Sequence, residues 1–129
     1  MRAVGGTPAV RMRRVYEQPT REDGARVLVD RVWPRGLRKD AARIDRWCKQ
    51  VAPSPQLRKW YGHDPRRFAE FSRRYRAELA AGEQAAALAE LRRLARQQTV
   101  TLLTATRQVE RSQAAVLAEL LAAPDPPPA

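Results

Sequence analysis

The stretch from residue 26 to residue 36 constrains the fold more than any other part of the chain. It opens with an uninterrupted apolar run at residues 27–29, which is typical of a strand buried on both faces of a sheet. Three charged residues follow, Asp30, Arg31 and Arg35, and a proline and a glycine end the strand. Because ligands of open α/β sheets bind at the carboxyl ends of strands, the stretch predicts a central strand that ends in a candidate site.

Apolar periodicity divides the remaining chain into two further strands and a set of helices. The predicted strands cover residues 10–16, 26–30 and 99–105, and the predicted helices cover 41–51, 55–60, 65–80, 84–97 and 112–122. The helices between the second and third strands make those two strands parallel, whereas the orientation of the first strand stays open. The predicted fold class is α/β: a single compact domain with a small, mostly parallel sheet of about three strands covered by about five helices.

The length of 129 residues fits one domain with its own core. We expect a disordered N-terminal extension at residues 1–9, the α/β domain at residues 10–122 and a proline-rich tail at residues 123–129. No apolar run approaches the length of about 20 residues that a membrane span needs. The single cysteine, Cys48, cannot form an intrachain disulfide or a cysteine-based metal cluster, and it is expected to be a buried, inert thiol. These features predict a cytoplasmic protein without membrane association, and they identify neither a cofactor nor an oligomeric state.

The formal net charge of +11 has two interpretations. It favours an anionic partner, which can be a small phosphorylated metabolite, a nucleotide or a nucleic acid. Arginine greatly outnumbers lysine and alanine is abundant, so the excess can equally reflect the composition that a GC-rich genome produces at permissive surface positions. Charge alone therefore does not decide between a binding role and a solvated surface.

Asp30 and the arginines beside it form the most specific candidate site. Asp30 is a candidate general base or metal ligand, or the partner that orients Arg31 or Arg35. The two guanidiniums can bind a phosphate or carboxylate with two parallel hydrogen bonds. The competing interpretation is a buried structural ion pair beside a tight turn.

The end of the third predicted strand supplies a second group of candidates, namely Thr104, Thr106 and Arg107. If the second and third strands are parallel, both groups lie at the same edge of the sheet. Hydroxyls beside guanidiniums suit an anion, and the amino end of the last helix would add partial positive charge. The sequence thus predicts an anion-binding pocket between the two strand ends.

The segment around the only histidine, His63, is a candidate third wall. His63 can act as an acid or base, or it can belong to a loop that caps two helices, since Asp64 is a good N-cap. Trp33 and Tyr61 are the better candidates for a pocket wall because they are less clearly periodic. Trp60 is a further candidate for ligand binding, although an aromatic residue at helical spacing is more often part of a core.

A basic run on the helix at residues 65–80 supports a different function. Its arginines are Arg66, Arg67, Arg73, Arg74 and Arg76, which can bind nucleic acid or form a solvated face. The sequence contains no helix-turn-helix signature, zinc-finger ligands, Walker loop or dinucleotide-binding fingerprint. Nucleic acid is therefore a possible but less favoured partner.

Two segments resemble a known family. Residues 30–36 (Asp-Arg-Val-Trp-Pro-Arg-Gly) and 62–65 (Gly-His-Asp-Pro) are similar to motifs of the YeaO-like branch of the domain of unknown function 488 family, and the resemblance covers residues 13–121. It implies a compact α/β fold, an intracellular protein and a shared motif that includes Asp30 and His63. The family name itself implies no established activity.

The chain departs from this family after the last strand. The family commonly reads Ala-x-Asp-x-x-His-Asn-x-Ala there, whereas this chain has Gln108 in place of the acid and Arg111-Ser112 in place of His-Asn. The resemblance therefore implies a binding-only or altered member if that acid and histidine carry chemistry. The leading hypothesis is a protein for an anionic small molecule, enzyme or not; the alternatives are a nucleic-acid-binding or regulatory accessory protein and a domain whose partner is another protein.

Overall fold

The computed structural model describes residues 9–122, which form four parallel strands in the order β1-β4-β2-β3. The strands are β1 (Val10–Arg14), β2 (Ala25–Leu28), β3 (Arg46–Trp47) and β4 (Val100–Thr104). The α/β fold and the parallel pairing of β2 with β4 are confirmed, and β1 is parallel as well. The sheet has one strand more than the predicted three, a two-residue edge strand. Apart from Ala9, the predicted extension at residues 1–9 and the tail at residues 123–129 lie outside the described residues.

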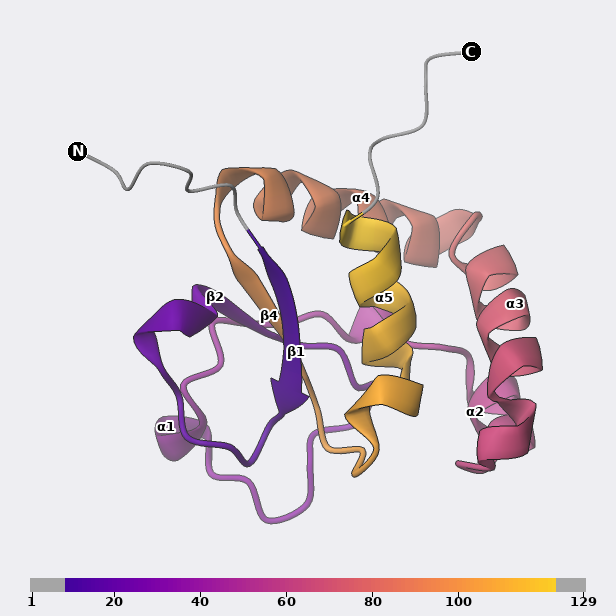
Figure 1. Ribbon diagram of the computed structural model, residues 1–129, viewed down its shortest axis with the longest axis horizontal. Coiled ribbons are helices and arrows are strands. Elements are labelled where there is room, and N and C mark those ends of the chain that lie inside the picture. The colour runs from indigo at the N-terminus through magenta and orange to yellow at the C-terminus, as the bar shows by residue number, and fades with distance from the viewer. Residues whose placement is uncertain (1–8, 123–129) are drawn as a thin grey trace.

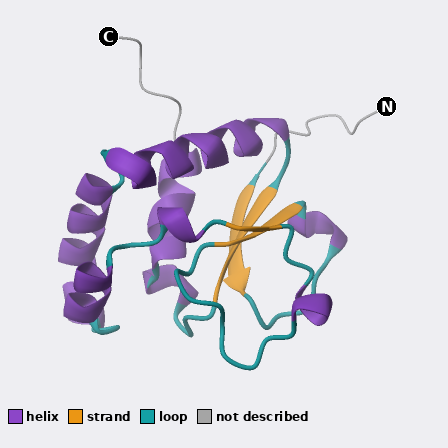
Figure 2. Ribbon diagram, turned by 180° about the vertical axis from the view of Figure 1, so that it is seen from behind, coloured by secondary structure: helices purple, strands orange, loops and turns teal. Residues whose placement is uncertain are grey.

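The helices cover the sheet unevenly. They are α1 (Lys39–Ala42), α2 (Pro55–Tyr61), α3 (Phe68–Glu78), α4 (Gly82–Gln97) and α5 (Gln113–Ala122). Figure 1 shows α5 beside β1 with α3 and α2 outside it, while α4 runs across the end of this group. Seen from behind, long loops connect the short elements around β2 and β3 (Figure 2). Four single 3₁₀ turns complete the described residues: Arg21–Asp23, Lys49–Val51, Pro65–Arg67 and Val109–Arg111.

Local signals set the start and end of α2 and the turn before α3. The hydroxyl of Ser54 accepts a hydrogen bond from the Leu57 amide at 3.1 Å, and the chain leaves α2 through Gly62 in the left-handed conformation, with φ of 55°. The Asp64 side chain caps the next turn by accepting from the Arg66 amide at 3.0 Å. The loop between α2 and α3 is therefore fixed by its own sequence.

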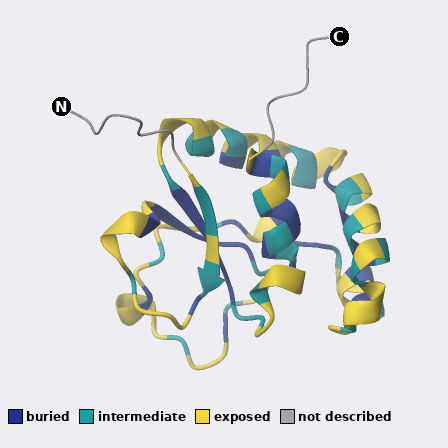
Figure 3. Ribbon diagram, viewed as in Figure 1, coloured by how far each residue is buried: buried dark blue, intermediate teal, exposed yellow. Residues whose placement is uncertain are grey.

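The core lies between the sheet and the helices α3, α4 and α5. Val27 of β2 and Leu102 of β4 have no exposed surface, and buried residues concentrate on the inner faces of the elements (Figure 3). From α3, Phe71 and Tyr75 enter this core, where Phe71 stacks on Tyr61 with ring centroids 4.3 Å apart. Burying such aromatic side chains is worth about 2–3 kcal/mol each, so α3 is held mainly by packing.

The predicted helix over residues 41–51 is wrong. Its apolar spacing suggested a continuous helix, but α1 ends after four residues because Arg43 adopts the left-handed conformation, with φ of 52°. The chain then becomes β3, and the Asp45 amide and the Cys48 amide donate to carbonyls of β2 at 2.9 and 2.8 Å. Pairing along the sheet edge outweighs the local helical preference. Cys48 is buried as predicted, although it lies beyond a strand rather than on a helix.

A buried carboxylate lies immediately before β2. Asp23 has no exposed surface, and its oxygens accept from Arg26 at 2.6 Å and from Arg13 at 3.1 Å, with Arg11 at 3.4 Å. The backbone amide and the hydroxyl of Thr20 donate to it as well, at 3.1 and 3.0 Å. Burial by itself would raise the pKa of Asp23, but these hydrogen bonds and the arginine charges lower it to about 2. We call Asp23, Arg11, Arg13 and Arg26 the Asp23 cluster.

Gly24 allows the chain to pass from this cluster into β2. Its φ is +61°, and a Cβ atom at this position would lie 2.1 Å from the carbonyl oxygen of Thr99. Only glycine tolerates both the conformation and the approach. The amino end of β2 is therefore rigidly defined by its neighbours.

Candidate ligand-binding site

A cavity of about 510 Å³ opens at the carboxyl edge of the sheet, beyond the end of β2. Its walls come from residues 30–34 after β2, from α2 with the loop before it, and from the segment between β4 and α5. These three segments are distant in sequence but converge here because β2 and β4 are parallel neighbours and end at the same edge. The volume suits a small organic ligand.

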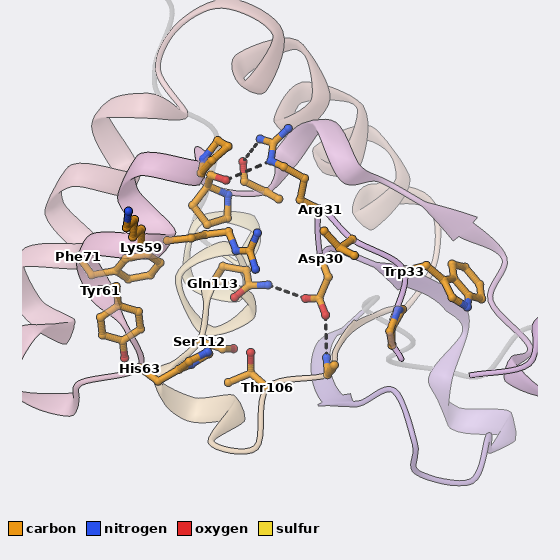
Figure 4. A pocket seen from close by; sticks show the side chains of 17 residues that line it. Asp30, Arg31, Trp33, Lys59, Tyr61, His63, Phe71, Thr106, Ser112 and Gln113 are labelled. Atoms are coloured by element: carbon orange, nitrogen blue, oxygen red, sulfur yellow. Dashed lines mark hydrogen bonds between the residues drawn. The ribbon is translucent and has the colours of Figure 1, made fainter. Parts of the chain in front are cut away.

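Asp30 lies at the base of this cavity and is held by neutral donors. Its Oδ1 accepts from the Thr104 hydroxyl at 2.7 Å and from Nε2 of Gln113 at 2.6 Å, and its Oδ2 accepts from the Ala105 amide at 2.8 Å. Figure 4 shows the Gln113 side chain reaching across the cavity to the carboxylate. Burial raises the pKa of Asp30, and the three hydrogen bonds and the charge of Arg58 offset this only in part.

The Thr104 hydroxyl supports Asp30 and is not available to a ligand. Thr104 is fully buried, and its single hydroxyl proton is directed to Asp30. The oxygen in turn accepts from the Thr106 amide at 3.2 Å. The sequence therefore brings Thr104 and Asp30 together as predicted, with Thr104 as a buried support and Thr106 on the cavity wall.

Arg31 lines the cavity, but its guanidinium is mostly engaged with the backbone. It donates from Nη2 to the carbonyl of Ala52 at 3.0 Å and from Nε to the carbonyl of Pro53 at 3.3 Å. The side chain thereby ties the end of β2 to the loop before α2. Glu78 fixes the same loop from α3, since it accepts from the Ser54 amide at 2.9 Å and from the Ser54 hydroxyl at 2.6 Å.

Arg58 and Lys59 of α2 bring positive charge to the cavity wall. Within residues 9–122, no carboxylate lies within 4 Å of either charged group, although the charge of Arg58 acts on Asp30 and lowers its pKa. Lys59 lies on the side of the cavity away from Asp30 (Figure 4). The cavity thus combines one carboxylate with three cationic side chains that lack ion-pair partners in the described part of the chain, and of these Arg31 already donates to two backbone carbonyls.

His63 also lines the cavity, in an uncommon backbone conformation. Its φ is 57°, which costs a non-glycine residue about 1 kcal/mol, and its ring centroid lies 6.2 Å from that of Tyr61. Tyr61 is anchored by its hydroxyl, which donates to the carbonyl of Arg111 at 2.7 Å. Figure 4 shows His63 and Tyr61 close together, on the side of the cavity away from Trp33.

The remaining predicted site residues divide into those on the cavity and those away from it. Trp33 borders the cavity, but its indole donates to the carbonyl of Leu37 at 2.8 Å and its ring is turned away from the other labelled side chains (Figure 4). Arg35 and Arg107 are exposed and do not line the cavity. Trp60 does not line it either, because the guanidiniums of Arg67 and Arg74 pack over its ring.

Sequence reasoning missed Arg58, Lys59 and Gln113. Nothing in their local sequence distinguishes them from other polar residues on helix surfaces. Their positions follow from tertiary placement: α2 ends beside the carboxyl edge, and α5 begins opposite Asp30. The predicted parallel pairing of β2 and β4 was the signal that could have drawn attention to Gln113, since it places the start of α5 at this edge.

The described residues provide neither a cluster of metal ligands nor a membrane-spanning helix. Among residues 9–122, no three His, Cys, Asp or Glu side chains are grouped so that they could ligate a metal ion. None of the described helices has both the length and the apolar character needed to cross a membrane.

Comparison with known proteins supplies the evolutionary context. The chain is 59% identical over 112 residues to the uncharacterised protein Rv3073c of Mycobacterium tuberculosis, which covers 87% of this chain and 92% of the relative. It is 38% identical over 112 residues to the uncharacterised protein YeaO of Escherichia coli, which covers 87% of this chain and 96% of that protein. No solved structure matches the chain. A family model described as "Inactive DUF488-N3 subclade" matches residues 9–124. The chain therefore belongs to the DUF488-N3i family, which confirms the YeaO-like resemblance of its sequence.

Proposed function

We propose that this protein binds a small anion, such as an organic phosphate, in the cavity at the carboxyl edge of the sheet. The observation that carries the proposal is the placement of Arg58 on the cavity wall without an ion-pair partner among residues 9–122. A charge-assisted hydrogen bond from a guanidinium to a phosphate is worth about 1.5–3 kcal/mol, so Arg58 would supply a large single contribution to the affinity. Lys59 adds a further positive charge to the cavity wall, on the side away from Asp30.

We favour binding without turnover. Asp30 is immobilised by three donors, and the groups that hold it are a hydroxyl, an amide side chain and a backbone amide, none of which is an acid or base near neutral pH. Gln108 and Arg111 occupy positions where the family commonly has an acid and a histidine. The description of the matching family as an inactive subclade agrees with this interpretation.

The net charge of +11 supports the alternative of nucleic-acid binding. The arginines on the exposed side of α3 are less available than the sequence suggests, because most have acidic partners. Arg73 and Arg74 both pair with Glu70, and Arg76 pairs with Glu119. With two carboxylates against three arginines, this helix surface is partly neutralised and is a weaker nucleic-acid site than a row of unpaired cations.

The test is an NMR titration of the full chain with ethyl phosphate, followed through backbone amide shifts. We expect saturable binding in the wild type and about a tenfold or larger loss of affinity in Arg58→Gln, because a charge-assisted hydrogen bond disappears. Arg73→Gln is the matched control, since it removes the same charge from α3, away from the cavity, and should leave the affinity unchanged. Absence of saturation, or equal affinity in wild type and Arg58→Gln, would refute the proposed pocket.

The same variants separate the two functions. If a single-stranded oligonucleotide binds with a steep dependence on salt, and Arg73→Gln weakens it more than Arg58→Gln does, the nucleic-acid alternative is correct.

A further inference from the structure

The hydrogen bonds on Asp30 leave one acceptor position without a donor among residues 9–122. A carboxylate offers about four lone-pair positions, two on each oxygen. Oδ1 uses both, for Thr104 and Gln113, whereas Oδ2 accepts only from the Ala105 amide within residues 9–122. Asp30 itself lines the cavity, so the second position on Oδ2 is available to a ligand there.

This open acceptor matters because its charge opposes the proposed ligand. A bare anion beside Arg58 would be repelled by Asp30, whose influence reaches that side chain. A ligand that presents a hydroxyl or amino group to Oδ2 replaces this repulsion with a charge-assisted hydrogen bond. Asp30 would then discriminate between anions that carry such a donor and anions that do not.

Besides Arg58 and Asp30, the cavity has room and apolar surface for the carbon skeleton of a ligand. Pro53 and Pro55 line it on the side of α2, and Phe71 contributes from α3. A volume of about 510 Å³ accommodates a molecule of the size of a pentose phosphate. An inorganic ion would leave most of this space to water.

We infer that the ligand is an organic anion that also carries a hydrogen-bond donor, with a sugar phosphate as the simplest class. The anionic group binds at Arg58, and the donor binds at Oδ2 of Asp30. This inference rests on the proposed anion-binding function and specifies the ligand of the same cavity. Asp30 is thereby a specificity-determining residue, and Thr104, Ala105 and Gln113 orient it.

Three phosphates that differ in the hydrogen-bond donor they carry test the inference on the full-length protein. Ethyl phosphate has no donor beyond the phosphate, ribose 5-phosphate has hydroxyls, and phosphoethanolamine has an ammonium group. We expect at least one donor-bearing phosphate to bind about tenfold or more tightly than ethyl phosphate, because it gains a charge-assisted hydrogen bond. Tighter binding of ribose 5-phosphate would identify the donor as a hydroxyl, and tighter binding of phosphoethanolamine would identify it as an ammonium group.

Variants of Asp30 assign the preference to this carboxylate. In Asp30→Ala the donor-bearing phosphates and ethyl phosphate should bind within about twofold of each other, and ethyl phosphate should bind at least as well as in wild type, because a repulsive charge is gone. Asp30→Asn keeps an oxygen without the charge and should show an intermediate preference. The wild-type comparison needs no variant, so it stands even if Asp30→Ala folds poorly.

The outcomes distinguish this inference from the function on which it rests. If no phosphate binds, or if binding does not depend on Arg58, the proposed function fails and the inference fails with it. If ethyl phosphate binds through Arg58 but neither donor-bearing phosphate binds more tightly, the function stands and the inference is overturned. A preference that persists in a folded Asp30→Ala protein would overturn it as well.

Discussion

Strand β2 has an aspartate at each end, and the two are held in opposite ways. Asp23, before the strand, is surrounded by the guanidiniums of Arg11, Arg13 and Arg26, and its pKa is lowered to about 2. Asp30, after the strand, is held by a hydroxyl and two amides, and burial raises its pKa. The first carboxylate is neutralised by the fold, whereas the second remains an accessible charge in a cavity.

The difference separates a carboxylate that is fully buried within the framework from one that lines a cavity. In the Asp23 cluster three guanidiniums surround one carboxylate, and these arginines cannot reverse their role because a guanidinium only donates. The donors around Asp30 include the Thr104 hydroxyl and the Gln113 amide, both of which can also accept. The carboxyl end of β2 therefore tolerates a change of charge that the amino end does not.

The largest expected effect is the loss of Asp23. Asp23→Asn leaves the buried Arg26 guanidinium without its carboxylate and should lower the free energy of unfolding by about 3 kcal/mol. Breaking a buried ion pair usually costs about 3–5 kcal/mol. We expect the low end of this range because Arg11 and Arg13 reach solvent, which screens the cluster. Urea unfolding measures the change. Asp40→Asn, which breaks only the exposed pair with Arg38, is the control and should stay within about 0.5 kcal/mol of wild type.

Asp23 and Asp30 should change the free energy of unfolding in opposite directions as the pH falls. Because the folded pKa of Asp23 is about 2, below the ordinary 3.8, its stabilising contribution is complete above pH 4 and disappears as the pH falls toward 2. The contribution is at most about 2 kcal/mol after screening. Asp30 acts in the opposite direction: its folded pKa is raised, so protonation favours the folded state as the pH falls through that pKa toward 3.8.

Unfolding of the wild type, Asp23→Asn and Asp30→Asn at a series of pH values between 2 and 7 separates the two contributions. The gap in stability between wild type and Asp23→Asn should narrow as the pH falls from 4 to 2. A gap that is constant across this range would mean that Asp23 is not held as an ion by the cluster.

The smallest expected effect on stability is that of Asp30→Asn. The asparagine oxygen can accept from the Ala105 amide, while its NH₂ group donates to a rotated Thr104 hydroxyl and a flipped Gln113 amide. Stability at pH 7 should therefore stay within about 1 kcal/mol of wild type. A loss as large as that of Asp23→Asn would show that the two ends of β2 are equally structural and would contradict the comparison.

The sequence predicted the framework well where local signals and tertiary structure agree. The apolar run of β2, the cap at Ser54 and the end of α2 at Gly62 lie where their residue types place them. The segment at residues 41–51 failed because its apolar spacing fits a helix, whereas backbone pairing of Asp45 and Cys48 with β2 decides the structure. Such pairing is a long-range contact that no local pattern records.

The candidate site was predictable only in part. The parallel arrangement of β2 and β4 brought Asp30 and Thr104 together, as their positions at two strand ends predict. The same reasoning assigned the anion to Arg31, Arg35 and Arg107. Arg31 lines the cavity but donates to backbone carbonyls, whereas Arg35 and Arg107 do not line it. Arg58 and Lys59 also line the cavity, and their positions depend on how α2 packs. The direction in which a side chain leaves a loop, and the packing of a helix, are tertiary properties.

A map of amide shifts in the wild-type protein on addition of ethyl phosphate tests most directly whether the cavity at the carboxyl end of β2 binds an anion. We predict saturable changes concentrated around the cavity, at Arg58, Ala105 and Gln113, with little change at Asp23 and Arg26. Changes centred on the Asp23 cluster or spread along α3, or no saturable change at all, would contradict the assignment of the carboxyl end of β2 as the binding site.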